Sequence, residues 1–473
     1  MQSRNAEPIK ITKLIMVIFS IIISQFTLAT SVEDIKGFTL KNGMEFLILE
    51  DHSIPNANMY LFWKVGSRNE APGITGLSHF FEHMMFNGAK KYGPKEFDRI
   101  MESHGGGNNA YTSENITAYT NWFPARAIEK IFELEADRIG NLVIDEKMLE
   151  SERNVVVSER ITGLENSNFR ILHEEVKGSA FRAHPYGWSV IGHDSDIKNW
   201  RKADLEDYFS TYYAPNNALV VMVGDVELES IKSLAKKYFS NIPANDAPRE
   251  VHTIEPEQKG ERRVFVNKAS AKAQAILIGY KVPESSHIDT FPLDVLGTLL
   301  AEGASSRLHR KLVDELELAT DLFFYSPMSF DPNLFYLYVE ARTGVSIEEI
   351  EKVIYQEIEN ISNGNIEESE LDKIKNIKTM DFYHQMETIN EKADTIGAYQ
   401  LFFGGYEKLF QTPETYGAIT KADVARVAKK YLNRRSRTVG VLGNEENKDL
   451  PVEEVIDSLK TSLKETTTDG ERI

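Results

Sequence analysis

The segment "HFFEH", residues 79 to 83, places two histidines four positions apart with a glutamate directly before the second. If it is helical, His79 and His83 lie on one face about one turn apart and can point their imidazoles at one ion. Zinc accepts imidazole nitrogen and carboxylate oxygen, and a catalytic zinc keeps one position for water. Glu82 would lie beside that water and act as its general base. The alternative is an ordinary solvated helix face.

A catalytic zinc site needs a third protein ligand, and the segment "LESERNVVVSER" (149–160) offers several carboxylates. It has the length of a helix, on which Glu152 and Glu159 would lie two turns apart along one face. One of them could bind the metal while the other orients a ligand or the water. Glu146 and Glu150 are also nearby, so spacing alone does not select the ligand. A charged, solvated helix face is again the alternative.

The elements that must position these residues alternate between strand and helix, which predicts an α+β fold with mixed layers. Runs rich in β-branched and aromatic residues predict strands at residues 58–67, 217–226, 262–269 and 333–342. Apolar residues at helical spacing predict helices at 125–143 and 348–361. The residues that could bind a metal thus lie on two further expected helices.

A long repeat divides the chain into two halves. "KADLEDYF" begins at Lys202 and "KADVARVA" at Lys421, 219 residues later, and Gly224 and Gly443 have the same separation. A shared offset predicts a duplicated structural unit, the alternative being a chance similarity between two helix starts. A stretch rich in proline and charge separates the halves. The predicted parts are an N-terminal zinc-binding domain at 35–245, a linker at 246–261 and a degenerate C-terminal domain at 262–465.

Composition narrows the function further. The chain has 473 residues, 41% hydrophobic and 27% charged, a balance typical of soluble globular proteins with more than one domain. A net charge of -18 disfavours nucleic acid as a partner. The absence of cysteine excludes disulfides, thiolate metal sites and a cysteine nucleophile.

The amino terminus has the pattern of a secretory signal peptide at residues 1–29. Arg4, Lys10 and Lys13 precede an apolar run at 14–23, and small residues follow, with a cut expected after Ala29. The apolar run is short for a membrane span of about 20 residues, so an uncleaved membrane anchor is the lesser alternative. A periplasmic or secreted location is expected.

Three ordered motifs, "HFFEHMMFNG", "GGGNNAYTSENITAYTNWFP" and "ESERNVVVSER", resemble those of the inverted-zincin metallopeptidases of the pitrilysin and insulin-degrading enzyme family, M16. The resemblance spans most of the chain. The chain resembles the half-length branch of this family, which includes the mitochondrial processing peptidase β subunit and bacterial zinc proteases. The resemblance implies that His79, His83 and Glu159 bind zinc, that Glu82 is the base, and that Glu152 is an additional carboxylate that assists the site.

The fold implied by the resemblance is half of a clam-shell built from two homologous α/β-sandwich domains. Each domain is a curved, mainly antiparallel sheet backed by helices. In the second half, the segment that matches the zinc helix is "LGTLLAEGASSRL" (296–308), which has no histidine pair. One Zn²⁺ per chain is therefore expected.

The same resemblance implies how a peptide substrate is held. The family uses an edge strand in the region of residues 108–122 to bind the substrate backbone, with Asn109, Ala110 and Tyr111 as the expected contacts, although an ordinary amphipathic edge strand is the alternative. Active full-length members carry an arginine and a tyrosine on a strand of their second half. Phe335 and Arg342 stand at the corresponding positions here. The pair is missing, which suggests that another chain supplies it.

The expected function is that of a zinc-dependent endopeptidase acting on peptides or unfolded segments inside an enclosed chamber. A second family subunit that lacks the zinc motif, or a second copy of this chain, would complete the chamber. One alternative is a non-catalytic structural or assembly subunit with the same fold. A metal carrier is a further alternative, which Glu82 disfavours because metal storage needs no base.

Overall fold

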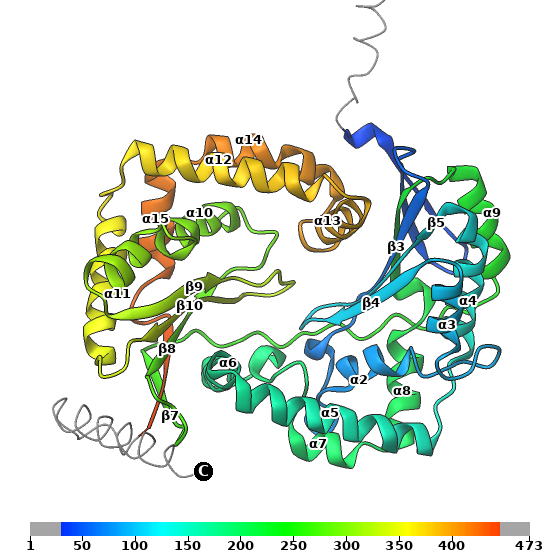
Figure 1. Ribbon diagram of the computed structural model, residues 1–473, viewed down its shortest axis with the longest axis horizontal. Helices are drawn as coiled ribbons and strands as arrows, with labels where there is room; N and C mark the ends of the chain where they lie inside the picture. The colour runs from blue at the N-terminus through cyan, green and yellow to red at the C-terminus, as the bar shows by residue number, and fades with distance from the viewer. Residues whose placement is uncertain (1–29, 445–473) are drawn as a thin grey trace, which may run out of the picture.

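The computed structural model describes residues 30–444, which form two β-sheets at opposite ends of an elongated molecule (Figure 1). The predicted signal peptide at 1–29 and the predicted domain end at 465 lie outside these residues. Helices cover both faces of each sheet. The prediction of an α+β fold made of two homologous sheet-and-helix units is confirmed.

The first sheet has six strands in the order β1-β2-β6-β3-β5-β4. They are β1 (Ile35–Thr39), β2 (Glu45–Glu50), β3 (Asn56–Trp63), β4 (Gly107–Thr112), β5 (Thr117–Pro124) and β6 (Ala218–Gly224). β6 is parallel to β2, and all other neighbouring strands are antiparallel. Every residue of β6 is buried because the strand lies inside a sheet covered on both faces, which explains its uninterrupted apolar sequence.

The second sheet has five strands in the order β7-β11-β8-β10-β9. They are β7 (Arg262–Asn267), β8 (Ala275–Val282), β9 (Ala319–Tyr325), β10 (Asn333–Ala341) and β11 (Arg437–Gly443). β7 and β11 form its one parallel pair, as β2 and β6 do in the first sheet. A shift of 219 residues carries the bounds of β3 onto β8 and those of β6 onto β11. The sequence repeat is therefore a repeat of structure.

The helices that the structure describes in the second half overlap, after the same shift of 219 residues, with helices of the first half. Those of the first half are α2 (Leu77–Met84), α3 (Glu96–Ser103), α4 (Ile128–Asn141), α5 (Glu146–Asn166), α6 (Asn168–Ala180), α7 (Asp194–Asn199), α8 (Lys202–Tyr212) and α9 (Leu228–Tyr238). Those of the second half are α10 (Thr290–Ala301), α11 (Ile347–Ser362), α12 (Glu368–Gln385), α13 (Ile389–Phe402), α14 (Thr412–Ala418) and α15 (Lys421–Tyr431). Within residues 30–444, none of the helices has both the length and the apolar character needed to cross a membrane.

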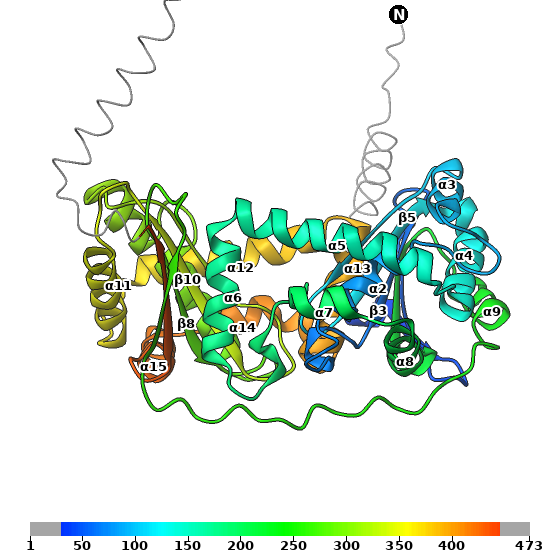
Figure 2. The same cartoon turned by 90° about the horizontal axis from the view of Figure 1, so that it is seen from below.

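Two equivalent helices, α6 and α13, are exchanged between the units (Figures 1 and 2). α6 packs on β7, β8 and β11 of the second sheet, whereas α13 packs on β3 and β6 of the first. Glycines permit the close approach. A Cβ at Gly440 in β11 would lie 2.6 Å from Val176 Cγ2 in α6, and one at Gly397 in α13 would overlap the ring of Phe62 in β3. Each sheet is thus covered on one face by a helix from the other unit.

Candidate metal centre and active site

The histidine-bearing segment forms α2, which lies beside the first sheet. Fully buried apolar side chains anchor one side of this helix in the core of the first unit: Leu77, Phe80, Phe81 and Met84. Since those side chains occupy the side toward the core, His79, Glu82 and His83 lie on the other side and stay partly accessible. The amphipathic pattern of α2 therefore presents the three polar side chains together.

A buried glutamate holds the start of α2. The carboxyl oxygens of Glu70 accept hydrogen bonds from the backbone N–H groups of Gly76 (2.7 Å) and Ser78 (2.8 Å), which the helix start leaves without intrahelical partners. Gly76 has a φ of 89°, a left-handed conformation that favours glycine. Burial raises the pKa of Glu70 to about 8. Glu70 thus fixes the turn that leads directly into His79.

Three side chains converge on one point beside α2. His79 Nε2 lies 3.7 Å from Glu159 Oε1, and His83 Nε2 lies 3.6 Å from Glu159 Oε2. One donor atom from each of the three residues lies within 4.8 Å of the others. No other group of three histidine or carboxylate side chains comes this close among residues 30–444. Two imidazoles and a carboxylate form a donor set that fits zinc.

The second glutamate of α5 lies behind His83. Glu152 Oε1 is 2.8 Å from His83 Nδ1, and Glu152 Oε2 accepts a hydrogen bond from Asn87 Nδ2 at 2.9 Å. A carboxylate in this place fixes the tautomer and orientation of a metal-binding imidazole. Of the two other carboxylates that spacing left open, Glu150 pairs with Arg153 at 3.6 Å, and Glu146 does not belong to the cluster.

Burial and the two carboxylates change the proton affinity of the histidines. Burial disfavours the charged form of His83, but the carboxylates of Glu152 and Glu159 raise its pKa to about 9. Burial lowers the pKa of His79 to about 4. Contact with His83 lowers the pKa values of both glutamates in turn. A divalent cation bound by His83 Nε2 and Glu159 would displace the Nε2 proton of His83, while the Nδ1 proton stays with Glu152, so its binding would release a proton.

Glu82 is linked to the edge of the first sheet. Its Oε2 accepts a hydrogen bond from Thr112 Oγ1 at 2.6 Å, at the end of β4. Burial raises the pKa of Glu82, which brings a carboxylate closer to the range in which it works as a base near neutral pH. Glu82 is adjacent to His83 in the chain but does not belong to the three-residue donor group. This placement suits a proton acceptor.

β4 is the last strand of the first sheet and pairs with β5 on one side only, as the edge-strand prediction requires. No other strand formed by residues 30–444 pairs with its free edge. Asn109 and Tyr111 are exposed, and Ala110 is half-buried. The Tyr111 hydroxyl donates to Asp394 Oδ1 of α13 at 2.9 Å. The backbone edge at these residues is therefore open, while the phenol is already engaged.

Two pockets adjoin the three-residue cluster. The first, of about 520 Å³, contains Glu82 and His83 together with residues of β4. The second, of about 250 Å³, contains His79 and Glu159 together with residues of α5 and α6. No lining residue is common to the two pockets. The cluster thus has a separate hollow next to each of its histidines.

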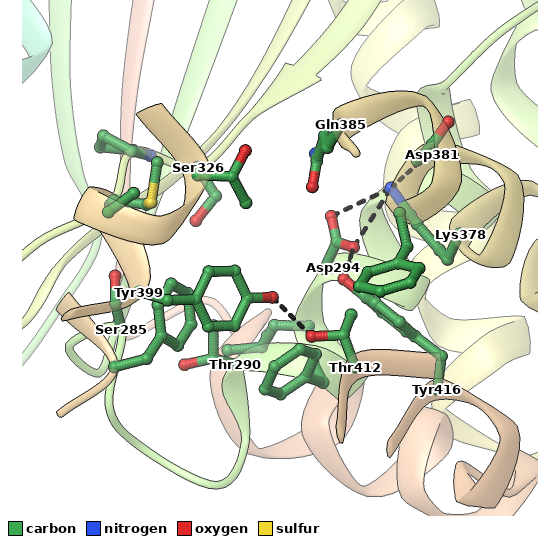
Figure 3. A pocket seen from close by; sticks show the side chains of 18 of the residues that line it. Ser285, Thr290, Asp294, Ser326, Lys378, Asp381, Gln385, Tyr399, Thr412 and Tyr416 are labelled. Carbon is green, nitrogen blue, oxygen red and sulfur yellow. Dashed lines mark hydrogen bonds and ion pairs between the residues drawn. The ribbon is translucent and has the colours of Figure 1, made fainter. Parts of the chain in front are cut away.

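Another pocket, of about 430 Å³, lies among α10, α12, α13 and α14 (Figure 3). Its Lys378 ammonium lies 3.1 Å from Asp294, 3.2 Å from Glu302 and 4.0 Å from Asp381. The cation is therefore already neutralised by carboxylates. None of the residues that line this pocket is a histidine. Its charged groups mainly form ion pairs with one another. The cluster beside α2 is therefore the better candidate for an active site.

The positions expected for the family's arginine and tyrosine lie in the other unit. Phe335 in β10 is fully buried and stacks on Phe324, with ring centroids 5.5 Å apart. Arg342 follows β10, and its guanidinium is 3.8 Å from Glu317. Neither Phe335 nor Arg342 lines a pocket beside the cluster. These two positions therefore contribute nothing to the candidate site within one chain.

Sequence reasoning missed four residues that shape the site: Glu70, Asn87, Thr112 and Arg170. Asn87 lies in the turn after α2, three residues beyond the last residue of the helix, so helical spacing could not have indicated its contact with Glu152. Glu70 and Thr112 reach α2 from a loop and from a strand, and no local pattern connects them to it. Arg170 reaches the second pocket from α6.

Comparisons with known proteins agree on one family. The model of "Insulinase (Peptidase family M16)" matches residues 45–194, and that of "Peptidase M16 inactive domain" matches residues 199–378. Zinc protease PqqE of Helicobacter pylori is 34% identical over 411 residues, 85% of this chain and 91% of PqqE. A crystal structure of a protease from Helicobacter pylori superposes with a TM-score of 0.84 at 32% identity, covering 88% of this chain and 100% of that chain.

A more distant structural likeness concerns the periplasmic protease PqqL of Escherichia coli. The structure of its first half has a TM-score of 0.72 at 20% identity, covering 92% of this chain and 98% of that half. Of the whole PqqL chain, 50% is covered. This likeness shows the fold alone. The relationship to PqqE extends over most of both chains, so the chain belongs to the insulinase family of peptidases, family M16.

Proposed function

We propose that the chain is a zinc-dependent endopeptidase that hydrolyses peptides or unfolded polypeptide segments. The observation that carries this proposal is the convergence of His79, His83 and Glu159 within 4.8 Å, on the same side of α2 as Glu82. A zinc ion held by these donors would act as a Lewis acid toward a peptide carbonyl and lower the pKa of a water molecule.

The residues around the donors have distinct proposed roles. Glu82 takes a proton from the attacking water and passes it to the departing amine. The Thr112 hydroxyl holds the Glu82 carboxylate through its 2.6 Å hydrogen bond. Glu152 is a positioning residue, because it acts on the reaction through His83.

We propose that the substrate backbone joins the free edge of β4 as an additional strand. Asn109, Ala110 and Tyr111 would form the contact through their backbone groups, since the Tyr111 hydroxyl is bound to Asp394. Thr112 belongs to the same strand and binds Glu82. The peptide and the base would therefore be held by one strand.

We propose that a second family subunit without the zinc motif, or a second copy of this chain, closes the chamber. The match to one half of PqqL supports this, because there the fold forms part of a longer chain.

The proposed parts remain a signal peptide at 1–29, domains at 35–245 and 262–465, and a linker at 246–261. The proposed location is the periplasm or the exterior, and the charge of -18 argues against a nucleic-acid partner.

The test is a fluorogenic peptide assay on the purified chain, alone and with a candidate partner, before and after chelation and again after addition of zinc. We expect cleavage that stops with chelation and returns with zinc, and one zinc per chain by elemental analysis. A non-catalytic structural or assembly subunit would cleave none of the peptides under any condition. Cleavage by the fully metal-free chain would contradict the proposed role of zinc.

A further inference from the structure

The 250 Å³ pocket beside His79 and Glu159 is smaller than the range typical of sites for drug-sized ligands. It can take one side chain or a chain end. Besides Glu159, four charged residues line it: Arg160, Arg170, Glu174 and Lys177. Which of these charges is available to a ligand depends on the partners that they already have.

Two of the three cations are occupied by carboxylates of the chain. The Arg160 guanidinium donates to both oxygens of Glu174, at 2.9 and 2.5 Å. The Lys177 ammonium donates to Glu114 at 2.5 Å, and both side chains of this pair are buried. His173 also lines the pocket, and burial lowers its pKa to about 3, so it is neutral near pH 7. The third cation makes no hydrogen bond or ion pair with a carboxylate among residues 30–444, and its charge helps to lower the pKa of Glu159.

That cation is Arg170, near the start of α6. Its exposed guanidinium makes no hydrogen bond or ion pair with another of residues 30–444. It lies over Gly163, where an added Cβ would be 2.5 Å from Nη1. Gly163 follows Glu159 by four residues and lies on the same face of α5, one turn further on. The missing side chain of Gly163 thus leaves room for a guanidinium one helical turn from the cluster.

We propose that Arg170 binds a carboxylate of the peptide substrate, an inference that rests on the proposed peptidase function. A guanidinium pairs with a carboxylate through two parallel hydrogen bonds. The carboxylate would come from an acidic side chain near the scissile bond or from the peptide's own C-terminus. The other pocket contains Asp98 and Glu102 besides Glu82, so it disfavours the same group. Arg170 is therefore a specificity-determining residue that offers the second pocket a cation for a carboxylate, which the first pocket lacks.

The test compares matched peptides on the zinc-loaded full chain. One arm uses internally quenched peptides with Glu or Gln at each of three positions on either side of the scissile bond. The other arm uses short peptides that end in a free carboxylate or an amide. We expect one Glu position, or the free carboxylate, to raise kcat/KM about tenfold, the size of one charge-assisted hydrogen bond. In Arg170→Gln this ratio should fall to about one.

Two further variants separate the charge from the fold. Gly163→Ala keeps the arginine but displaces its guanidinium, so the ratio should fall there too. Arg126→Gln removes an exposed arginine of the first half that lines neither pocket, and the ratio should stay at its wild-type value. Fluorescence anisotropy of the same peptides bound to Glu82→Gln chains, with and without Arg170→Gln, measures the preference without turnover.

The possible outcomes can be told apart. A preference at a Glu position identifies an acidic side chain as the ligand, and a preference for the free carboxylate identifies the chain end. Equal ratios in wild type and Arg170→Gln would overturn the proposal for Arg170 and leave the peptidase function standing. An equal loss of kcat on Glu and Gln peptides would also overturn it, since Arg170 would then act on the reacting carbonyl. If wild type cleaves no peptide and anisotropy shows no preference, both proposals fail.

Discussion

The carboxylate of Glu152 lies 2.8 Å from His83 Nδ1 and holds the imidazole with its Nε2 toward Glu159. Asn87 fixes the other oxygen of Glu152 at 2.9 Å. Among residues 30–444, His79 has no equivalent support, because its buried Nδ1 has no hydrogen-bond partner. The orientation of the His83 imidazole is therefore fixed by the side chains of Glu152 and Asn87, whereas that of the His79 imidazole depends on its place in α2.

The first prediction concerns Glu82. Glu82→Gln should keep close to one zinc per chain, because Glu82 is outside the donor group, and should lose activity by about 10²- to 10⁴-fold through loss of the general base. Elemental analysis and a fluorogenic peptide assay measure the two quantities. Loss of zinc in proportion to activity would show that Glu82 is a ligand.

The second prediction separates the two glutamates of α5. Glu159→Ala should lower zinc affinity far more than Glu152→Ala, because Glu159 faces the Nε2 atoms of both histidines while Glu152 reaches neither Nε2 and contacts His83 through Nδ1. Glu152→Ala should reduce zinc affinity or activity by about 10- to 100-fold. Competition with a chromogenic chelator gives the affinities. The reverse order would mean that Glu152 is the ligand.

The third prediction concerns the start of α2. Glu70→Ala leaves the buried N–H groups of Gly76 and Ser78 without acceptors, at a cost of about 1–3 kcal/mol each, and should weaken zinc binding as the first turn of α2 loosens. Glu50→Ala is the control, because Glu50 accepts an exposed hydrogen bond from the N–H of Leu228 at the start of α9. It should leave zinc affinity unchanged. Urea unfolding and zinc titration measure the two effects, and equal zinc affinity in both variants would contradict the role of Glu70.

The fourth prediction concerns pH. Burial disfavours the Glu114 carboxylate, but the Lys177 ammonium holds its pKa at about 2, below the ordinary value of 4.5. A lowered folded-state pKa stabilises the fold above about pH 4.5, and this contribution is lost as the pH falls toward 2. Glu114→Gln should therefore lower the free energy of unfolding by about 3–5 kcal/mol at pH 7, because it leaves Lys177 buried and unpaired.

The difference between wild type and Glu114→Gln should shrink as urea unfolding is repeated at lower pH. The double variant Glu114→Gln/Lys177→Met should recover much of the loss at pH 7, since no unpaired charge remains. A difference that does not change between pH 7 and pH 3 would mean that the ion pair does not stabilise the fold.

The fifth prediction concerns assembly. The chain alone should bind zinc but cleave peptides weakly, because Phe335 and Arg342 place no arginine and tyrosine at its site. A partner that closes the chamber permanently should bury more than about 1,200–2,000 Å². Sedimentation and activity should be measured before and after mixing with a family member that lacks the zinc motif. Full activity in a strict monomer would contradict this prediction.

The spacing of residues along the sequence predicted those relationships between side chains that depend on the geometry of a single helix. The separation of His79 from His83, and that of Glu152 from Glu159, translate directly into faces of α2 and α5. The repeat was also readable, since Lys202 and Lys421 begin equivalent helices. The assignment of zinc ligands and base to these residues remains a prediction that the experiments above test.

Contacts between segments that are far apart in the chain could not be predicted from the sequence. Nothing local connects Thr112 with Glu82, or Glu70 with the start of α2. The strand predicted at 58–67 spans residues 56–63 in the structure. Val65 prolonged the apolar pattern, but it lies beyond the end of β3 and is apolar because it is buried in the core. The exchange of α6 and α13 was missed for a similar reason, since their apolar faces do not indicate which sheet they cover.

The exchange of α6 and α13 between the two units determines whether the two halves of the chain can separate. A half-chain made alone would lack the helix that covers one face of its sheet and would leave Phe62 or Leu277 without its cover. We therefore expect the two repeats to fold as one cooperative unit, although their sequences indicate a duplication. A protease that nicked the chain at 246–261 would leave the two pieces clasped together, each still holding a helix against the other's sheet.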